Sequence, residues 1–152
     1  MTSELHHYRE CGLDNIFLLN GFTVRETSHG RAVSIEDIDG LHRAIGMHLA
    51  KEKRTLTGAE LRFLRVEMGL SQKLLGMLLG KTAQTVARWE KGQSRIDGTA
   101  DRVVRVLYGE QTGENEKIRK VLQELAALGD LAGDDEFRFE DTEEGWRLHS
   151  AA

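Results

Sequence analysis

Three short helices in close succession, each with its own start and stop signal, constrain the fold of this sequence most strongly. A Ser or Thr precedes each helix, where its hydroxyl can accept a hydrogen bond from a backbone N–H of the first turn. A glycine follows each helix, and glycine readily adopts the left-handed backbone that ends one. The capping residues are Thr57, Ser71 and Thr82, and the closing glycines are Gly69, Gly80 and Gly92.

The first of these helices has the most complete start signature. Thr57 and Glu60 stand three residues apart, so each side chain can bond the backbone N–H of the other. Leu56 and Leu61 flank the cap and can pack against each other. The predicted helices run from Gly58 to about Met68, from Gln72 to Leu79 and from Ala83 to about Lys91.

The second and third helices are predicted to cross at a steep angle. Gly76 supplies the small side chain that a close crossing needs, and Gly80 supplies the tight turn between the helices. Val86 and Trp89 lie three residues apart, so they form an inner apolar stripe on the third helix. Two helices joined by a short glycine turn form a helix-turn-helix unit, whose second helix enters the DNA major groove.

The segment LSQKLLGMLLGKTAQTVARWEKG resembles the Cro/cI-type (XRE-type) DNA-binding domain. The resemblance covers about residues 56–108 and needs no insertion or deletion. One departure is Gly76, where alanine is usual in the family, and this glycine costs the helix roughly 1 kcal/mol. The matching positions are Leu70, Ser71, Gln72, Gly80, Val86, Trp89, Glu90, Lys91 and Gly92.

A looser resemblance extends over most of the chain, to the MqsA-type antitoxin regulators. Those proteins carry a zinc-binding N-terminal module built on paired cysteines, whereas this chain has only Cys11 and scattered histidines. A structural zinc site needs four ligands, usually in closely spaced pairs, so we predict no metal and no other cofactor. The N-terminal sheet must then be held by apolar packing of Ile16, Leu18, Phe22, Val24, Val33 and Ile35.

The predicted fold class is α+β, in three parts. Residues 1–53 form a small β-rich module, in which Asn20-Gly21 is a hairpin-turn signal within a sheet of two or three strands, followed by a linking helix over Ile38–Lys53. Residues 54–109 form a helix-turn-helix domain of the five-helix type. Residues 110–152 form an amphipathic helix and an acidic β-hairpin, with a possible role in dimerisation.

Two apolar patterns characterise the C-terminal part. Ile118, Val121, Leu122, Leu125 and Leu128 recur at helical spacing within 114–128. Segments 136–140 and 146–149 alternate around an acidic turn, as hairpin strands do. The residues expected on the buried sides of that hairpin are Phe137, Phe139, Trp146 and Leu148. Both patterns could complete one core, or they could form a homodimer contact.

The charge distribution favours a nucleic-acid partner although the net charge is −4. Residues 51–105 carry 12 basic and 6 acidic side chains, whereas both flanking segments are net acidic. A localised basic segment is the electrostatic footprint that phosphate binding requires. A chance fluctuation among solvated charges would give the same pattern. The charge distribution therefore supports the helix-turn-helix prediction but would not by itself indicate DNA binding.

The docking geometry of such domains assigns the contact residues. The exposed N-terminal residues of the second helix meet base edges, and Gln84 can pair with adenine while Arg88 pairs with guanine. Glu90 is expected to cap or pair locally, since phosphate would repel it. The predicted base-reading residues are Ala83, Gln84, Thr85 and Arg88; the predicted phosphate-binding residues are Gln72, Lys73, Lys81, Thr82, Lys91 and Arg95.

The pattern predicts a transcriptional regulator that binds double-stranded DNA, as a dimeric repressor reading palindromic half-sites. The alternative is an antitoxin that sequesters a toxin protein and autoregulates its operon. No nucleophile elbow, phosphate loop or HExxH motif is present, so no catalytic residue and no enzyme is predicted. No signal peptide or membrane-length apolar run is visible, and we expect a cytoplasmic, nucleoid-associated bacterial protein.

Overall fold

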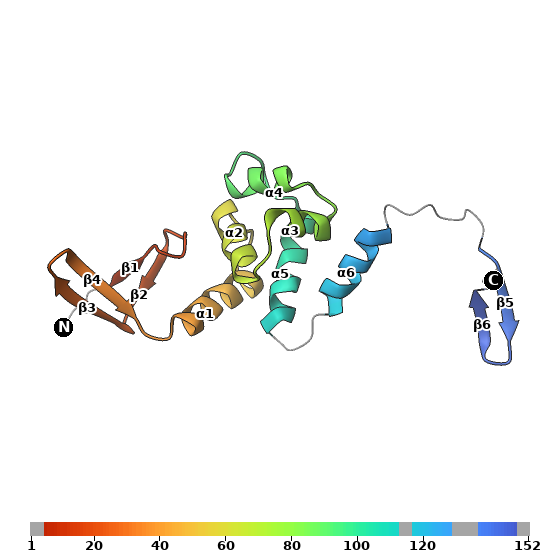
Figure 1. Cartoon of the computed structure of the whole chain (residues 1–152), viewed down its shortest axis with the longest axis horizontal. Coiled ribbons are helices and arrows are strands. Elements are labelled where there is room, and N and C mark those ends of the chain that lie inside the picture. The colour runs from red at the N-terminus through yellow and green to blue at the C-terminus, as the bar shows by residue number, and fades with distance from the viewer. Residues whose placement is uncertain (1–4, 113–116, 129–136, 149–152) are drawn as a thin grey trace.

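The computed structural model describes residues 5–112, 117–128 and 137–148 (Figure 1). The described chain is α+β, as predicted, with helices at the centre and short antiparallel hairpins towards both ends. The strands are β1 (His6–Tyr8), β2 (Ile16–Leu18), β3 (Phe22–Thr27), β4 (Gly30–Ile35), β5 (Phe139–Thr142) and β6 (Gly145–Leu148). The helices are α1 (Ile38–Lys51), α2 (Gly58–Glu67), α3 (Gln72–Leu79), α4 (Ala83–Glu90), α5 (Gly98–Thr112) and α6 (Lys117–Leu128).

The strand pairing of the N-terminal module differs from the prediction. β2 pairs back onto β1, with His6 opposite Leu18, and β3 pairs with β4, so two separate hairpins form. Asn20-Gly21 therefore connects the two hairpins and does not close one. Gly21 has a φ of 79° and its carbonyl accepts from the N–H of Glu36, which closes the base of the second hairpin. The short strand β1 has no alternating pattern long enough to be predicted.

A hydrogen-bond chain ties the N-terminal module to the central helices. The carboxylate of Glu67 lies 2.9 Å from Nδ1 of His42, and Nε2 of His42 lies 2.7 Å from the Tyr8 hydroxyl. The His42 ring therefore bridges Glu67 and Tyr8 through its two nitrogens. Burial raises the pKa of Tyr8. β1, α1 and α2 are thus joined by polar contacts as well as by apolar packing.

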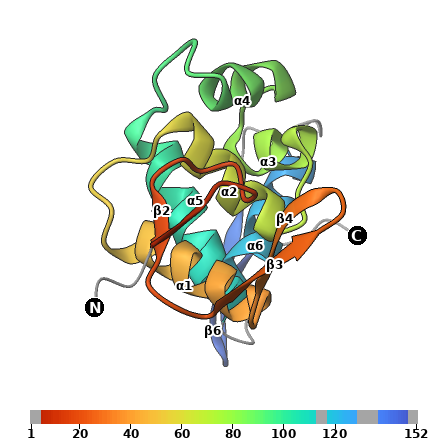
Figure 2. The same ribbon diagram turned by 90° about the vertical axis from the view of Figure 1, so that its left-hand side faces the viewer.

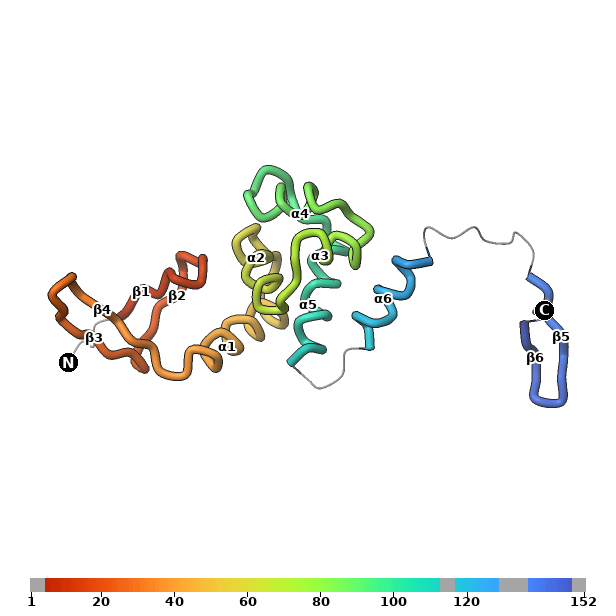
Figure 3. Tube along the Cα trace, in the orientation of Figure 1, coloured from red at the N-terminus to blue at the C-terminus, as the bar shows by residue number. Residues whose placement is uncertain are grey.

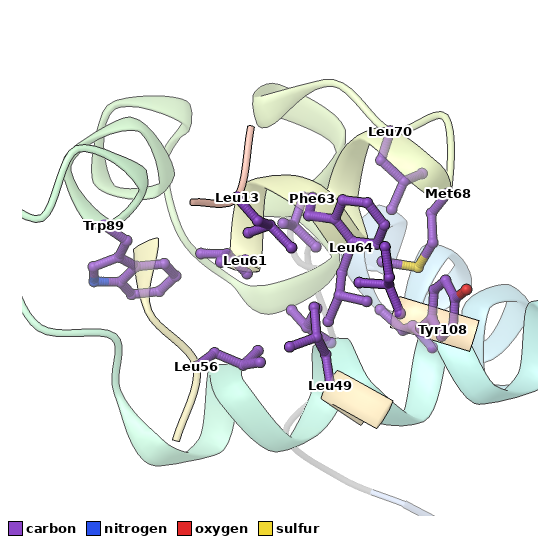
Figure 4. Close-up of a cluster of buried hydrophobic side chains, with 14 of the residues drawn as sticks. Leu13, Leu49, Leu56, Leu61, Phe63, Leu64, Met68, Leu70, Trp89 and Tyr108 are labelled. Atoms are coloured by element: carbon purple, nitrogen blue, oxygen red, sulfur yellow. The ribbon is translucent and has the colours of Figure 1, made fainter. Parts of the chain in front are cut away.

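The core lies among the central helices (Figure 4). Leu61, Leu64 and Val86 are completely buried, and Leu49 of α1 packs in the same cluster. Tyr8 and Leu13 extend this core into the N-terminal module, which faces the viewer in front of α1 and α2 in Figure 2. Among the residues predicted to hold the sheet, Leu18 is buried; Ile16, Phe22, Val24, Val33 and Ile35 are half-buried.

The central helices begin where their sequence signals predict. Thr57, Ser71 and Thr82 each cap a helix through the hydroxyl, and Thr57 with Glu60 forms the complete capping box. Asp37 caps α1 by accepting from the N–H of Gly40. The ends of α2 and α4 fall one residue earlier than predicted, at Glu67 and Glu90, as expected where a last turn tightens.

The C-terminal hairpin does not complete the core of the single chain, so the first of the two predicted alternatives is wrong for it. Phe137, Phe139, Trp146 and Leu148 are all exposed, Trp146 to 73 % of its surface. In Figure 3 the hairpin β5–β6 lies apart from the helices, so no other element of the described ranges covers either of its faces. A two-stranded hairpin has no interior of its own. Alternation of apolar and polar residues does not show whether another element of the chain packs on the apolar face. The predicted residues 114–116, 136 and 149 lie outside the described ranges.

Helix α6 packs on α3 and α5, with only one edge of its apolar face. Leu122 is half-buried against the core. The other apolar residues of that face, Ile118, Val121, Leu125 and Leu128, are exposed. Within the described ranges, no helix is both long enough and apolar enough to cross a membrane.

Candidate nucleic-acid interface

The turn between α3 and α4 is set by two glycines. Gly80 ends α3 in the left-handed conformation, with a φ of 68°. A Cβ built on Gly76 would lie 2.7 Å from the carbonyl oxygen of Lys81, so the backbone of the turn passes directly against α3. The N–H of Lys81 donates to the carbonyl of Gly76 at 2.7 Å. The predicted packing role of Gly76 is confirmed, and the second helix leaves the turn at a fixed angle.

Buried ionic contacts hold α4 against α2. Arg65 donates from Nε to Oε2 of Glu90 at 2.7 Å and from Nη2 to Oε1 at 2.9 Å, while its Nη1 donates to the carbonyl of Leu70. The Gln72 side chain also donates to Glu90, at 3.1 Å. Both charged side chains are largely buried, so each needs the other. As predicted, Glu90 pairs locally; it fixes the orientation of α4.

A close backbone approach completes this support. Gly58 opens α2 next to the last turn of α4, and a Cβ there would lie 2.2 Å from the carbonyl oxygen of Trp89. Trp89 itself is buried, as is Val86. The inner face of α4 is therefore in contact along its length, and only the outer face can meet a ligand.

The four predicted base-reading residues lie on the first two turns of α4. Gln84 and Arg88 are exposed, one turn apart, on the side opposite Val86 and Trp89. Their side chains form no hydrogen bond or ion pair with another described residue. Ala83 and Thr85 are half-buried. The two long side chains therefore share one accessible surface.

The predicted phosphate contacts fall into two groups. Lys73, Lys91 and Arg95 are exposed, and their side chains have no described partner. The others are already engaged: Gln72 with Glu90, Thr82 with Thr85, and Lys81 with Asp97 at 3.4 Å. The side-chain amide of Gln72 is held by the buried Glu90 carboxylate. The backbone N–H of Gln72, at the start of α3, is therefore the group that could bind a phosphate.

Asp97 has two roles beside this surface. Its carboxylate accepts from the N–H of Ala100 at 2.7 Å and so caps α5, and it also pairs with Lys81. The hydrogen bond from Ala100 and, to a lesser extent, Lys81 lower the pKa of Asp97. The pKa of Asp97 is thus lower in the folded than in the unfolded protein. The ionised carboxylate therefore stabilises the fold above the ordinary aspartate pKa, about 4. This stabilisation is lost as the pH falls through the pKa of the folded protein.

We expect Asp97→Asn to tighten DNA binding while leaving the fold intact. Asparagine caps a helix as well as aspartate does, but it releases Lys81 and removes a negative charge. A surface ion pair is worth about 0.2–1 kcal/mol, so affinity for any duplex should rise about 1.4- to fivefold at low salt. Fluorescence anisotropy at several salt concentrations measures this. Unchanged affinity together with a lowered Tm would mean that Lys81 does not face DNA.

The sequence prediction missed three arginines next to this surface. Arg54, Arg102 and Arg105 lie with Arg95 around a pocket between the segment before α2 and the first turns of α5. They come from segments far apart in the sequence, so no spacing links them. The basic excess of residues 51–105 was the only available signal.

The histidines and Cys11 do not gather into a metal-ligand set. No group of three His, Cys, Asp or Glu side chains that could hold a metal ion occurs within the described part of the chain. His42 is committed to Tyr8 and Glu67. The prediction that the protein needs no zinc remains a prediction.

Comparison with known proteins agrees with this geometry. The family model described as helix-turn-helix matches residues 61–100, which span most of α2, all of α3 and α4, and the start of α5. No curated protein and no solved structure matches the chain. The matched segment contains the capped helices, the glycine turn and the buried stripe of α4. The chain thus carries, over residues 61–100, a helix-turn-helix domain of the kind found in Cro/cI-type (XRE-type) DNA-binding proteins.

Proposed function

We propose that this protein is a dimeric repressor that reads palindromic half-sites with the outer face of α4. The observation that carries the proposal is the position of Gln84 and Arg88 on one exposed face, opposite the buried Val86 and Trp89. Gln84 suits adenine and Arg88 suits guanine, each with two hydrogen bonds in the major groove. Ala83 and the Thr85 methyl group can contact thymine methyl groups.

Phosphate contacts on both sides of α4 hold it in the groove in this proposal. Lys73 lies on α3 and Lys91 and Arg95 follow α4, so a DNA backbone could be contacted on either side of the reading helix. Such contacts fix position and supply affinity without choosing bases. The local basic excess then outweighs the net charge of −4, and affinity falls steeply as salt rises.

Two matched variants test the division between base readers and phosphate anchors. Arg88→Ala should cost roughly 1–3 kcal/mol on the preferred site and relax the choice at one base position. Lys73→Ala should weaken binding about equally on all sequences and reduce the salt slope by about one unit. Both side chains are exposed and without described partners, so neither change should affect folding.

The measurement is a binding assay on a panel of single-base variants of a site selected from random duplexes. Arg25→Ala, on β3, is the control for loss of one positive charge far from α4. If Arg88→Ala loses affinity evenly over the panel while Lys73→Ala changes base preference, the helix reads DNA through a different face.

The dimer is proposed to form through α6 and the C-terminal hairpin. A single reading helix contacts few base pairs, and domains of this kind usually pair across a twofold axis to read half-sites about 34 Å apart. The apolar face of α6 is left open, with Val121 and Leu125 about half exposed. The hairpin adds the exposed Phe139 and Trp146. Exposed apolar surface of this extent is typical of an interface.

We expect the double variant Val121→Glu with Leu125→Glu to be monomeric and to bind a palindromic site at least tenfold more weakly. Two carboxylates would have to be desolvated in an apolar contact. Gln123→Glu, on the polar side of α6, adds charge without touching that face and is the matched control. Sedimentation equilibrium measures the mass. A wild-type monomer at high protein concentration, or a double variant that stays dimeric, contradicts the proposal.

A second candidate function is that of an antitoxin. The N-terminal module exposes Phe17 and Leu19 on and beside β2, away from α4 in the sequence and in Figure 1. Such residues suit contact with a partner protein, and a toxin is the partner that the antitoxin-like layout suggests. The two functions are compatible, because an antitoxin of this type also represses its own operon. If an adjoining gene encodes a toxic protein and this protein neutralises it, the antitoxin function is supported. If no such gene is present, a stand-alone repressor is favoured.

A further inference from the structure

A pocket with a basic wall lies next to the start of α5, outside the face assigned to base reading. Its volume is about 280 Å³, and it is lined by residues from before α2, from the α4–α5 connection and from α5. Its charged lining residues are Arg54, Arg95, Arg102, Arg105 and Asp101. Four guanidinium groups around one cavity create a local positive potential that attracts anions.

One of the four arginines is already neutralised. Arg105 donates from Nε to Oδ1 of Asp101 at 2.6 Å, and Oδ2 of Asp101 accepts from the N–H of Leu56 at 2.9 Å. Both charged side chains are largely buried. Both carboxylate oxygens of Asp101 thus have a partner in the protein, so the pair forms a nearly neutral part of the wall.

The other three arginines remain uncompensated. Arg54, Arg95 and Arg102 are exposed, and none forms a hydrogen bond or ion pair with another residue that the structure describes. The pocket therefore carries a local charge of about +3 at neutral pH, since arginine stays protonated. Guanidinium groups bind oxyanions through two parallel hydrogen bonds, which makes this cluster suited to a phosphate.

A buried donor gives a second indication. Arg105 donates from Nη1 to the carbonyl of Lys53, but its Nη2 is buried and has no hydrogen-bond partner in the described chain. An unsatisfied buried N–H of a charged group is destabilising by more than a typical hydrogen bond contributes. The cation that lines the pocket therefore keeps one donor without an acceptor among the described residues.

We propose that this pocket is a phosphate-binding site, with Arg54, Arg95 and Arg102 as its ligands. The phosphate has two possible sources. It is either a backbone phosphate of DNA beyond the base pairs that α4 contacts, which would lengthen the bound site, or the phosphate of a small free molecule. The first source rests on DNA binding through α4, whereas the second does not depend on it.

The first experiment tests free phosphate on the full chain without DNA. Inorganic phosphate and pyrophosphate are compared with sodium chloride at matched ionic strength, with thermal unfolding as the readout. Binding at about ten times the Kd should raise Tm by roughly 4 °C. The double variant Arg54→Gln with Arg102→Gln should lose this shift, while Arg25→Gln on β3 should keep it. The Tm of each variant in chloride reports whether it is folded.

The second experiment tests the DNA backbone. Duplexes with the same central site carry flanks whose phosphates are replaced one at a time by neutral methylphosphonates. For the wild type, one flanking position should lower affinity about tenfold, and the double variant should be insensitive there and show a salt slope shallower by about one unit, as expected for the loss of one phosphate contact. A short duplex without flanks measures DNA binding by α4 alone. If the wild type does not bind that duplex, the proposal that α4 reads DNA fails, independently of the pocket.

Each pattern of results decides the matter. A phosphate-dependent Tm shift that the double variant lacks, without a flank effect, assigns the pocket to a free phosphate; both effects together show a phosphate site that DNA also occupies. A flank effect without a Tm shift assigns it to the DNA backbone. If the folded double variant behaves as the wild type in both experiments, the pocket does not bind phosphate and the proposal is overturned.

Discussion

Replacing Glu90 with alanine is expected to lower the free energy of unfolding by about 3–5 kcal/mol. The Glu90 carboxylate accepts two hydrogen bonds from Arg65 and one from Gln72, in a place where water cannot substitute for them. Its removal would leave the Arg65 guanidinium buried without a counter-ion. DNA affinity should fall too, because this contact holds α4 in position.

Urea denaturation measures the loss of stability. Glu52→Ala is the control, since Glu52 forms an exposed pair with His48 that should contribute less than 1 kcal/mol. The double variant Arg65→Met with Glu90→Leu should recover much of the stability, because it removes both buried charges together. A Glu90→Ala protein as stable as the control would show that the pair is hydrated in solution.

Alanine at Gly58 and at Gly98 should have effects of opposite sign. Each glycine is the first residue of a helix, α2 or α5. At Gly98 a Cβ meets nothing within 4 Å, so alanine should be neutral or stabilise by up to about 1 kcal/mol. At Gly58 the Cβ would lie 2.2 Å from a backbone carbonyl of α4, and such overpacking costs typically 1–3 kcal/mol.

The Tm and the DNA affinity of Gly58→Ala and Gly98→Ala, each compared with the wild type, test this expectation. Gly58→Ala must push the end of α4 outwards, so it should weaken DNA binding beyond what its lower stability explains. Gly98→Ala should bind DNA with at most a small change, through the pocket next to it. Equal stabilities for the two variants would contradict the tight approach of α2 to α4.

Local signals made the helical centre predictable. The caps at Thr57, Ser71 and Thr82 and the glycine at Gly80 act within one turn of chain, so the sequence carries them directly. The pairing of β2 with β1 and the exposure of the C-terminal hairpin depend on distant partners. Alternation shows which residues share a face, but it does not show what that face meets.

The same distinction applies to the candidate site. Gln84 and Arg88 could be placed by counting from a cap, and their exposure agrees with that count. The pocket arginines could not, because Arg54 and Arg102 are brought together only by the packing of α5 beside the segment before α2. The ion pair between Lys81 and Asp97 could not be predicted from the sequence either, because it depends on the path of the chain after α4.

The support of α4 from its inner side has a consequence for how such a protein can be retargeted. Glu90, Trp89 and the approach at Gly58 determine where the helix sits, and none of them belongs to the outer face. Gln84 and Arg88 make no contact on which this placement depends. Mutations at these two positions should therefore carry almost no stability cost. With the base-reading role proposed above, a lineage or a designer could change the operator while the scaffold stays as it is.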